Sequence, residues 1–245
     1  MQNYKILDWD SNFFGFTVAL ILPRKLTENE LTETIEQMKQ YGVTLAYWAS
    51  EPEDKDSQAC AQSRNAFLAD RKATYVIPSA KIKTNSKCFT KGNLLVEEYP
   101  YLVPTDELID LALQAGEFSR FKIDPLIPDV KFVELYKLWI NRSVAREIAD
   151  TVFVIRREEK IAGMVTVGEK NGRADIGLIA VDRSMRGQSA GTALVEAAQN
   201  WGLINGYSAA QVVTQGDNLS ACRFYEKCGY SLDKVENVYH FWINL

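Results

Sequence analysis

Histidine and cysteine are scarce in this chain of 245 residues, and their scarcity argues against a metal centre. The only histidine is His240, and the four cysteines, Cys60, Cys88, Cys222 and Cys228, include no pair with C-x-x-C spacing. Because structural zinc sites combine closely spaced thiolates and imidazoles, we expect no bound metal. We interpret the cysteines as small buried apolar residues, since a disulfide framework is unusual in a cytosolic chain of this size.

Long apolar runs and a strong net charge are lacking as well. No apolar stretch approaches the ~20 residues of a membrane helix, and the first residues do not resemble a signal peptide. The chain has 28 Lys and Arg against 32 Asp and Glu, a formal net charge of −4. This balance gives no general attraction to nucleic acid or to anionic membranes. We therefore expect a cytoplasmic protein that binds neither.

The first third of the chain alternates strand and helix patterns, which predicts a small α/β domain. Thr27 and Glu30 form a capping box, and the helix that they open ends at Gly42. The other expected elements are an aromatic turn at 9–15, strands at 16–22, 43–49 and 74–78, and a helix at 57–71. A polar run at 81–93 separates this part from the rest. We place an N-terminal α/β domain at 1–88 and a second domain at 89–245.

The second domain is expected to begin with helices around a loop, followed by hairpins. Thr105 caps a helix that ends at Ala115, and Asn171-Gly172 is a strong hairpin signal. The expected helices are 106–115, 130–145, 192–205 and 218–228, the loop is 118–125, and the strands are 94–98, 152–156, 161–167, 174–181, 209–214, 230–232 and 238–243. The last strand could pair across a homodimer.

The stretch from Val181 to Ala198 predicts a strand end, a basic turn with glycine, and a helix. Such a turn directs unpaired backbone N–H groups and the positive end of the helix dipole toward one point, where a pyrophosphate can bind. Arg186 adds positive charge, and Gly187 and Gly191 allow close approach to the backbone. The alternative is an ordinary turn between a strand and a helix.

Three local patterns resemble the GCN5-related N-acetyltransferase (GNAT) family. Residues 186–191 are similar to the acyl-CoA turn [Q/R]-x-x-G-x-[G/A], although Ser189 stands where glycine is usual. Residues 218–230 are similar to N-x-x-A-x-x-x-Y-x-x-x-G-[FY], and residues 176–181 are similar to the strand that leads into the turn. The resemblance implies an α/β chain whose second domain has the α+β GNAT fold, with a mixed, largely antiparallel central sheet flanked by helices.

The resemblance also implies acetyl-CoA as co-substrate, without a metal. The residues that it assigns to acetyl-CoA are Ile179, Ala180, Val181, Arg186, Gly187, Gln188, Ser189, Ala190, Gly191, Thr192, Asn218 and Ala221. One of the backbone N–H groups near 179–181 would stabilise the oxyanion, on a strand that often bulges. In the alternative interpretation, Asn218 is simply the N-cap of its helix.

The resemblance assigns the acid that protonates the leaving thiolate to Tyr225. A phenol has an ordinary pKa of about 10, so it is neutral at pH 7 and can donate a proton. Periodicity alone favours a packed ring, because Ala221, Phe224 and Tyr225 share one helix face. The candidates for a general base are Glu169, Asp175, Tyr239 and His240, and spacing singles out none of them. Our preferred hypothesis is a water chain, with His240 in a solvated or structural role.

A narrower resemblance concerns the acceptor. Residues 9–15, 118–121, 139–141 and 213–218 are similar to a branch of this family that acetylates the amine of a nucleotide-linked 4-amino-4,6-dideoxy sugar. Substrate-binding candidates are Phe14, Ser119, Arg120, Phe121 and Lys122, whose cations could pair with a diphosphate while the rings stack on base or sugar. The alternatives are a core position for Phe14 and a solvated loop for Arg120 and Lys122.

The sequence thus predicts an acetyl-CoA-dependent N-acetyltransferase that acts on a nucleotide amino sugar of the dTDP type. One alternative is the same chemistry on another amine, such as a polyamine, an antibiotic-like amine or a protein N-terminus. Another is a non-catalytic acyl-CoA-binding module, which would have no need of a phenol at Tyr225.

Overall fold

A computed structural model describes residues 2–82, 90–91 and 94–244 of the chain. By their contacts these residues divide into two compact units. The first unit is Met1–Ala73 with Gln215–Asp217 and Lys234–Leu245, and the second is Thr74–Thr214 with Asn218–Asp233. The predicted domain boundary between residues 88 and 89 lies outside the described residues and stays a prediction.

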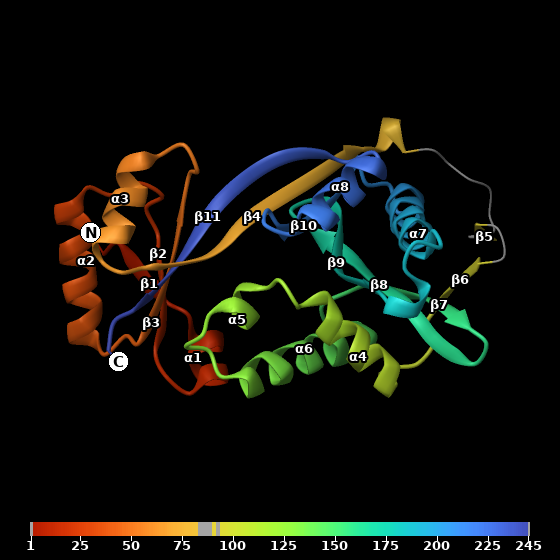
Figure 1. Ribbon diagram of the computed structural model, residues 1–245, viewed down its shortest axis with the longest axis horizontal. Coiled ribbons are helices and arrows are strands. Elements are labelled where there is room, and N and C mark those ends of the chain that lie inside the picture. The colour runs from red at the N-terminus through yellow and green to blue at the C-terminus, as the bar shows by residue number, and fades with distance from the viewer. Residues whose placement is uncertain (1, 83–89, 92–93, 245) are drawn as a thin grey trace. The chain divides into compact units, whose positions relative to one another are not determined.

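The first unit is an α/β layer of five strand segments (Figure 1). Its strands are β1 (Tyr4–Ile6), β2 (Val18–Ile21), β3 (Leu45–Ser50), the end of β11 (Ser231–Trp242) and the start of β4 (Phe67–Pro78), in the order β1-β2-β3-β11-β4. β2 and β3 are parallel, whereas β1 and β11 run antiparallel to β2 and β3. Its helices are α1 (Asp8–Phe14), α2 (Glu28–Tyr41) and α3 (Lys55–Ser63).

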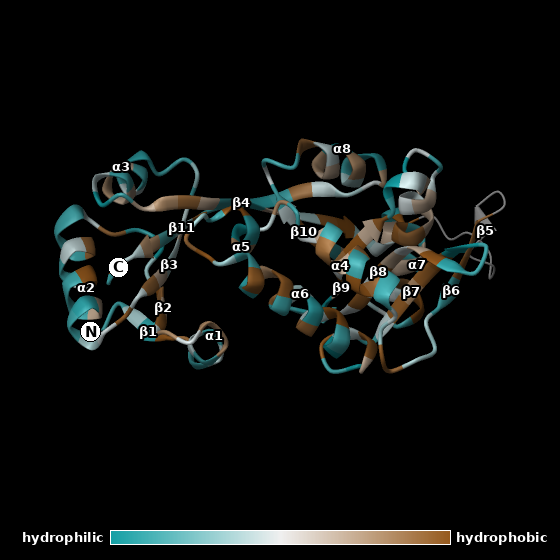
Figure 2. Cartoon of the chain, turned by 60° about the horizontal axis from the view of Figure 1, so that its bottom comes forward, coloured by the Kyte–Doolittle hydropathy of each residue, from teal (hydrophilic) through white to brown (hydrophobic). Residues whose placement is uncertain are grey.

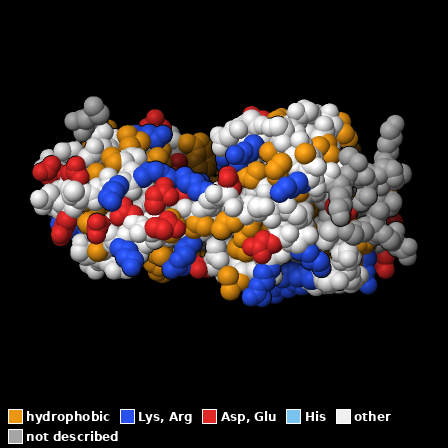
Figure 3. Space-filling model, turned by 90° about the horizontal axis from the view of Figure 1, so that it is seen from above, with side chains coloured by type: hydrophobic (Ala, Val, Ile, Leu, Met, Phe, Trp, Pro, Cys, Tyr) orange, Lys and Arg blue, Asp and Glu red, His pale blue; other side chains and the backbone are white. Residues whose placement is uncertain are grey.

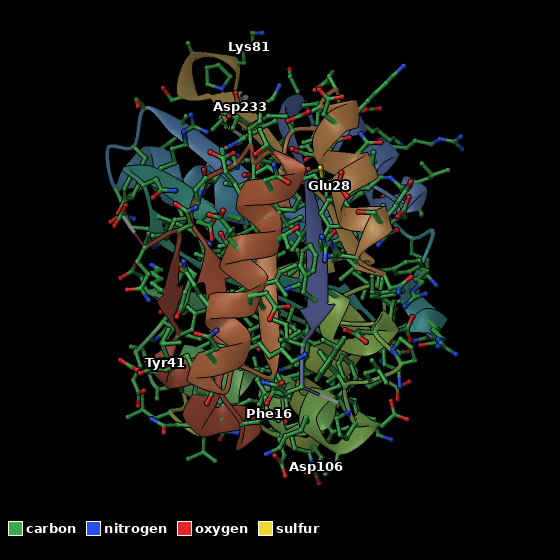
Figure 4. The ribbon with its side chains drawn as sticks, turned by 90° about the vertical axis from the view of Figure 1, so that its left-hand side faces the viewer. Phe16, Glu28, Tyr41, Lys81, Asp106 and Asp233 are labelled. Atoms are coloured by element: carbon green, nitrogen blue, oxygen red, sulfur yellow. The ribbon has the colours of Figure 1, made fainter. Side chains whose placement is uncertain are left out.

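Helix α2 begins and ends where the sequence predicts. The Thr27 N–H donates to Glu30 Oε2 at 2.8 Å, and the Glu30 N–H donates to Thr27 Oγ1 at 3.3 Å. At its other end Gly42 takes a left-handed φ of 84°. Figure 4 shows the helix running from Glu28 to Tyr41 in front of the strands, and in Figure 2 its ribbon changes between hydrophilic and hydrophobic along the turns. Leu31 and Met38 form its buried side.

The second unit is built on a mixed, largely antiparallel sheet, as the sequence predicts. Its strands are β5 (Thr90–Lys91), β6 (Leu94–Glu98), β7 (Thr151–Arg157), β8 (Lys160–Lys170), β9 (Arg173–Val181), β10 (Ala209–Gln215) and the end of β4, in the order β4-β10-β9-β8-β7-β6-β5. β5 to β9 form an antiparallel meander, and β10 is parallel to β9. The turn Asn171-Gly172 has positive φ at both residues, which is the hairpin geometry expected there.

Helices cover both faces of this sheet. They are α4 (Asp106–Ala115), α5 (Arg120–Ile123), α6 (Asp129–Val144), α7 (Ala190–Ile204) and α8 (Leu219–Lys227), with short 3-10 turns at Ser79–Lys81 and Arg183–Met185. α4 and α6 lie side by side and share a core with Met164 of β8 (Figure 1). The neighbouring Gly163 instead faces Leu194 of α7, and successive strand residues point to opposite faces. α7 therefore covers the other face.

Several predicted elements are wrong in type or extent. The helix expected at 57–71 ends at Ser63, because Asn65 takes a left-handed φ of 53° and Phe67 already begins β4. The turn expected at 9–15 is helix α1, which Gly15 ends with a φ of 81°. The loop at 118–125 contains α5, and the two closing strands are the single strand β11.

β11 is an interior strand. Its residues 237–242 pair with β3, and β4 lies on its other side. Both rows of its backbone groups therefore face strands of the same chain, so the expected pairing of this strand across a homodimer is wrong. Among the described residues, no helix combines the length and the apolar character that crossing a membrane requires.

Candidate active site

The turn after β9 is held by its own side chains. Asp182 accepts a hydrogen bond from the Ser184 N–H at 2.9 Å, which caps the 3-10 turn. The Arg186 Nε donates to the Val181 carbonyl at 3.1 Å, and the Gln188 amide donates to the Ser184 carbonyl at 3.1 Å. Residues 186–189 are exposed. The segment is thus ordered by local bonds and open on its outer side.

Ser189 lies in a backbone conformation that favours glycine. Its φ is 65° and its ψ is 5°, in the left-handed region that costs most L-residues about 1–2 kcal/mol. This conformation explains why glycine is usual at the corresponding position of the acyl-CoA turn that residues 186–191 resemble. Within the described residues, the Ser189 side chain makes no capping bond to α7. The first N–H groups of α7, which have no partner inside the helix, are therefore left for an external acceptor.

Gly191 is the point where the three sequence patterns meet. A Cβ atom at Gly191 would lie 3.2 Å from Cζ of Phe224, on α8, and 3.8 Å from Cγ2 of Val181, at the end of β9. The amino end of α7 thus lies against the ring next to Tyr225. These patterns are separate in the sequence, at 176–181, 186–191 and 218–230, and the fold brings them to one place in the second unit.

Tyr225 is a buried side chain of α8, with 4% of its surface exposed. Its ring lies among those of Phe224, Tyr75 and Tyr230, with centroids 5.3, 6.1 and 6.1 Å away. Burial raises the pKa of the Tyr225 phenol far above its ordinary value, because the phenolate would lose its solvation. The phenol is therefore neutral at physiological pH. Asn218 caps the helix, accepting from the Ala221 N–H at 3.1 Å.

β9 is interrupted by a bulge. Val167 pairs with Ile176 and Val165 pairs with Ile179, so Gly177 and Leu178 stand opposite the single residue Thr166. The bulge falls immediately before the segment 179–181, where the oxyanion donor is expected. The pairing of β9 with β10 runs only as far as Ile176 and Val212, although both strands continue. The two parallel strands therefore separate from this point onward.

The four candidate bases are all engaged elsewhere. Glu169 accepts a hydrogen bond from the Gly172 N–H at 2.6 Å in the hairpin turn. Asp175 accepts from Gln211 at 2.8 Å, and its partial burial raises the pKa of its carboxyl. Tyr239 and His240 lie buried on β11 in the first unit, beside Trp48 and Tyr47 respectively. His240 is thus structural rather than solvated.

The acceptor-site candidates divide between the two units. Phe14 is buried in the first unit, stacked with Phe16 at 5.6 Å, which fits the core alternative. Ser119 to Lys122 belong to the second unit, at α5. The Arg120 guanidinium lies 4.6 Å from the centre of the buried Phe121 ring, and Lys122 pairs with Asp129 at 2.7 Å. Ser119 has 5% of its surface exposed, and its hydroxyl has no hydrogen-bond partner among the described residues.

The sequence interpretation gave no role to three residues that shape the site. Phe224 precedes the predicted acid Tyr225 in the sequence, but its position beside the turn at Gly191 was not predicted. An isolated glycine within a strand, such as Gly177, is a signal for a bulge, and this signal could have predicted the position of the bulge in β9. Thr166 carries no local signal, because its part depends on a residue of the next strand. Within the described ranges, no group of three or more His, Cys, Asp or Glu side chains could hold a metal ion.

The chain is similar to known proteins in both sequence and fold. Residues 115–230 match the model of the Acetyltransferase (GNAT) family. The chain is similar to the dTDP-fucosamine acetyltransferase of Escherichia coli O6:H1, with 30% identity over 232 residues that make up 94% of this chain and 93% of that protein. It is also similar to streptothricin acetyltransferase A of Bacillus subtilis strain 168, with 30% identity over 63% of this chain and 84% of that protein.

The fold also has solved counterparts. A GCN5-related N-acetyltransferase from Sphaerobacter thermophilus aligns with a TM-score of 0.64, covering 97% of this chain and 75% of that one. The sequence identity of 11% makes this a likeness of fold alone.

Proposed function

The chain belongs to the acetyltransferase (GNAT) family, and from this premise we propose that it acetylates the amine of a nucleotide-linked 4-amino-4,6-dideoxy sugar. The observation that carries this proposal is the similarity to dTDP-fucosamine acetyltransferase, which spans more than nine-tenths of both chains. A match of that extent includes the first unit, which apart from residues 215–217 lies outside the matched family segment 115–230. Acyl transfer itself follows from the family. The choice of acceptor is the new part.

Acetyl-CoA is the acetyl donor of this family, and the turn at 186–192 fits its pyrophosphate. The free N–H groups at the start of α7 and the helix dipole favour a dianionic group there. The absence of a side chain at Gly191 leaves the approach to Phe224 open. We assign Gln188, Ser189, Ala190, Gly191 and Thr192 to the pyrophosphate. Arg186 supports the turn through the Val181 carbonyl and adds charge.

The pantetheine arm of the donor is assigned to the place where β9 and β10 separate. Backbone groups that leave a strand ladder need other partners, and an extended amide chain can supply them. We assign Ile179, Ala180 and Val181 to this contact, with Asn218 and Ala221 at the start of α8. One N–H of the 179–181 segment faces the acetyl carbonyl and stabilises the negative charge that develops on its oxygen.

Bound acetyl-CoA supplies the acetyl group, which passes from its sulfur to the attacking amine. Tyr225 then acts as the general acid, because its phenol stays neutral and can give its proton to the departing thiolate. Each of the four candidate bases already contacts another group: Glu169 and Asp175 accept hydrogen bonds, and Tyr239 and His240 pack against aromatic rings. We therefore propose that the amine loses its proton through water rather than to a dedicated base.

The acceptor is assigned to α5 and its surroundings. Arg120 projects from a helix of four residues above the ring of Phe121, and Ser119 adds a buried hydroxyl without a partner within the described chain. A guanidinium recognises the oxygens of a diphosphate through two parallel hydrogen bonds. Lys122 pairs with Asp129, so its role in binding requires exchange of that partner.

A second candidate acceptor is a streptothricin-type amine. It is favoured by the similarity to streptothricin acetyltransferase A, which has the same 30% identity but covers only 63% of this chain. The net charge of −4 suits a cationic acceptor. The nucleotide sugar remains the better proposal, because the match that favours it covers 94% of this chain rather than 63%.

The test is thiol release from acetyl-CoA by the full chain with a matched panel of acceptors. The panel contains dTDP-4-amino-4,6-dideoxygalactose, its UDP-linked counterpart, the same sugar without a nucleotide, and streptothricin. We expect the highest kcat/KM with a nucleotide-linked sugar. Release with streptothricin alone would replace the proposed acceptor, and release with none of them would favour a non-catalytic acyl-CoA-binding module.

A further inference from the structure

The bulge in β9 has a side chain bound to it. Thr166 of β8, which is 2% exposed, accepts a hydrogen bond at its Oγ1 from the Leu178 N–H at 2.8 Å. A bulge leaves one backbone group without its ladder partner, and a buried N–H without a partner costs about 1–3 kcal/mol. The Thr166 hydroxyl takes the place of the missing carbonyl. The bulge is thus satisfied from the neighbouring strand.

The bulge also changes which face of the sheet each residue of β9 occupies. Ala174 faces α7, where a Cβ on Gly202 would lie 2.7 Å from its own. Leu178 and Ala180 lie in the opposite core, with α4 and α6, and Val181 faces α7 beside Gly191. In a regular strand, Ala174, Leu178 and Ala180 would share one face. Because of the extra residue, each side chain after the bulge lies on the opposite face of the sheet from the one it would occupy in a regular strand.

From these contacts we propose that Thr166 is a positioning residue that holds the end of β9 in its catalytic orientation. This inference rests on the proposed function, in which an N–H of residues 179–181 faces the acetyl carbonyl. The pairing with β10 stops at Ile176, immediately before the bulge. Hydrogen bonds to β10 therefore do not hold residues 179–181, which carry the N–H group proposed to face the acetyl carbonyl. On the opposite side, residues 179–181 pair with residues 163–165 of β8, and the Thr166 hydroxyl holds the bulge immediately before them.

Gly177 supports this arrangement from within the bulge. A Cβ atom there would lie 2.9 Å from Thr166 Oγ1, closer than a real Cβ approaches another atom. Its φ lies outside the left-handed region, so the requirement is for space rather than for backbone freedom. A side chain at Gly177 would displace the hydroxyl. Gly177 and Thr166 thus form one unit, in which the first residue leaves room for the second.

The experiment compares Thr166→Val, which keeps the shape and removes the hydroxyl, with Thr166→Ser, which keeps the hydroxyl. Thr151→Val is the matched control, because Thr151 is equally buried on β7 and its hydroxyl has no partner among the described residues. We expect Thr166→Val to lower kcat about tenfold or more while the KM for acetyl-CoA changes less than about threefold, since the pyrophosphate site is intact. Thr166→Ser and Thr151→Val should keep at least about a third of kcat.

A second readout does not depend on the acceptor. Hydrogen exchange of the Leu178 amide should be at least about tenfold faster in Thr166→Val than in wild type, Thr166→Ser or Thr151→Val. If no acceptor supports turnover in the wild type, the proposed function fails and this exchange rate alone decides the role of Thr166. Equal exchange in all four proteins, or equal kcat in Thr166→Val and Thr166→Ser, would overturn the inference. Should Thr166→Val not fold, Gly177→Ala must lower kcat in its place.

Discussion

At the scale of single residues, the proposed chemistry depends on the environment of one phenol. Tyr225 is surrounded by the rings of Tyr75, Phe224 and Tyr230, and this burial disfavours its charged form. A raised pKa makes tyrosine a weaker acid in the ground state, but it keeps the proton available at every physiological pH. A coenzyme A thiol has an ordinary pKa of about 8.5, below that of this phenol. The proton passes to sulfur as the thiolate departs, and the phenol is reprotonated by the proton that the amine releases into water.

Tyr225→Phe tests this role, because it removes the hydroxyl and keeps the packed ring. We expect turnover to fall by about 10²-fold with little change in the affinity for acetyl-CoA. Steady-state kinetics and calorimetry measure the two quantities. Tyr75→Phe is the matched control, since Tyr75 is a neighbouring buried phenol to which no catalytic role is assigned. Unchanged turnover in Tyr225→Phe would remove the acid from the mechanism.

Gly191→Glu tests the pyrophosphate site. The new side chain would begin 3.2 Å from Phe224 and would add a negative charge where the turn is proposed to bind one. We expect no measurable binding of acetyl-CoA by calorimetry. Gly191→Ala, which adds only the Cβ, should bind within about tenfold of wild type, because the Phe224 ring needs to move by only a few tenths of an ångström. Normal binding by the Glu variant would mean that the donor binds elsewhere.

Ser189→Gly separates backbone strain from hydrogen bonding. Glycine tolerates the φ of 65°, so we expect the free energy of unfolding in urea to rise by no more than about 1 kcal/mol. The Ser189 side chain does not cap α7 within the described chain, so we propose that its hydroxyl donates to a phosphate. Its loss should then raise the dissociation constant of acetyl-CoA about fivefold. An unchanged constant would leave only the backbone in contact with the pyrophosphate.

At the scale of elements, α8 brings together buried phenols on one packed surface. Burial raises the pKa values of Tyr75, Tyr225 and Tyr230. All three belong to the second unit, and each must bind its proton more tightly in the folded than in the unfolded chain. Because the folded state then binds more protons above the ordinary pKa of tyrosine, its stability must fall as the pH rises.

We therefore expect the free energy of unfolding to be independent of these phenols below about pH 9 and to fall as the pH rises above about 10. Urea denaturation at pH 8 and at pH 10.5 measures the difference. Tyr225→Phe should reduce the loss between the two pH values, since it removes one of the three groups. A loss of the same size in this variant would show that the phenol of Tyr225 ionises normally in the fold.

Helix α5 is the element on which the acceptor assignment depends. Arg120→Ala should raise the KM of the nucleotide sugar about tenfold or more and leave that of acetyl-CoA unchanged, because the guanidinium is assigned only to the diphosphate. Lys131→Ala serves as the control, since Lys131 is a cation of the adjacent α6 that pairs with Glu134 at 3.0 Å. A change in both constants, or in neither, would place the acceptor elsewhere.

The elements that the sequence predicted well are those with local signals. Thr27, Thr105 and Asn218 act as caps as expected, and the Asn171-Gly172 turn forms its hairpin. One mistaken element, the end of the helix expected at 57–71, depends on distant partners as well as on Asn65. Phe67 and Leu68 have apolar side chains that suit a helix as well as a strand, and only the pairing that the rest of the chain provides makes them part of β4.

At the scale of the whole molecule, the chain crosses between its units more than once. β4 and β11 each begin in one unit and end in the other, and residues 215–217 belong to the first unit although both of their neighbours belong to the second. No local pattern in the sequence marks such crossings. The sequence therefore predicted the turn before α7 and helix α8, which are contiguous motifs, but neither the approach of Gly191 to Phe224 nor the bond of Thr166 to Leu178.

Charged side chains of both signs lie close together on the first unit. Figure 3 shows basic and acidic side chains interspersed over the first unit. Several of them form ion pairs there, such as Arg71 with Asp217 at 2.7 Å and Lys72 with Glu236 at 3.5 Å.

The central claim is that the full chain moves an acetyl group onto the amine of a nucleotide-linked sugar. The most direct measurement follows ¹³C-labelled acetyl from acetyl-CoA by NMR, with dTDP-4-amino-4,6-dideoxygalactose and streptothricin as competing acceptors in one solution. We predict that the label appears on the 4-amino nitrogen of the nucleotide sugar first, and about 10²-fold more slowly with Tyr225→Phe. Label on streptothricin alone, or on neither amine, would contradict the account.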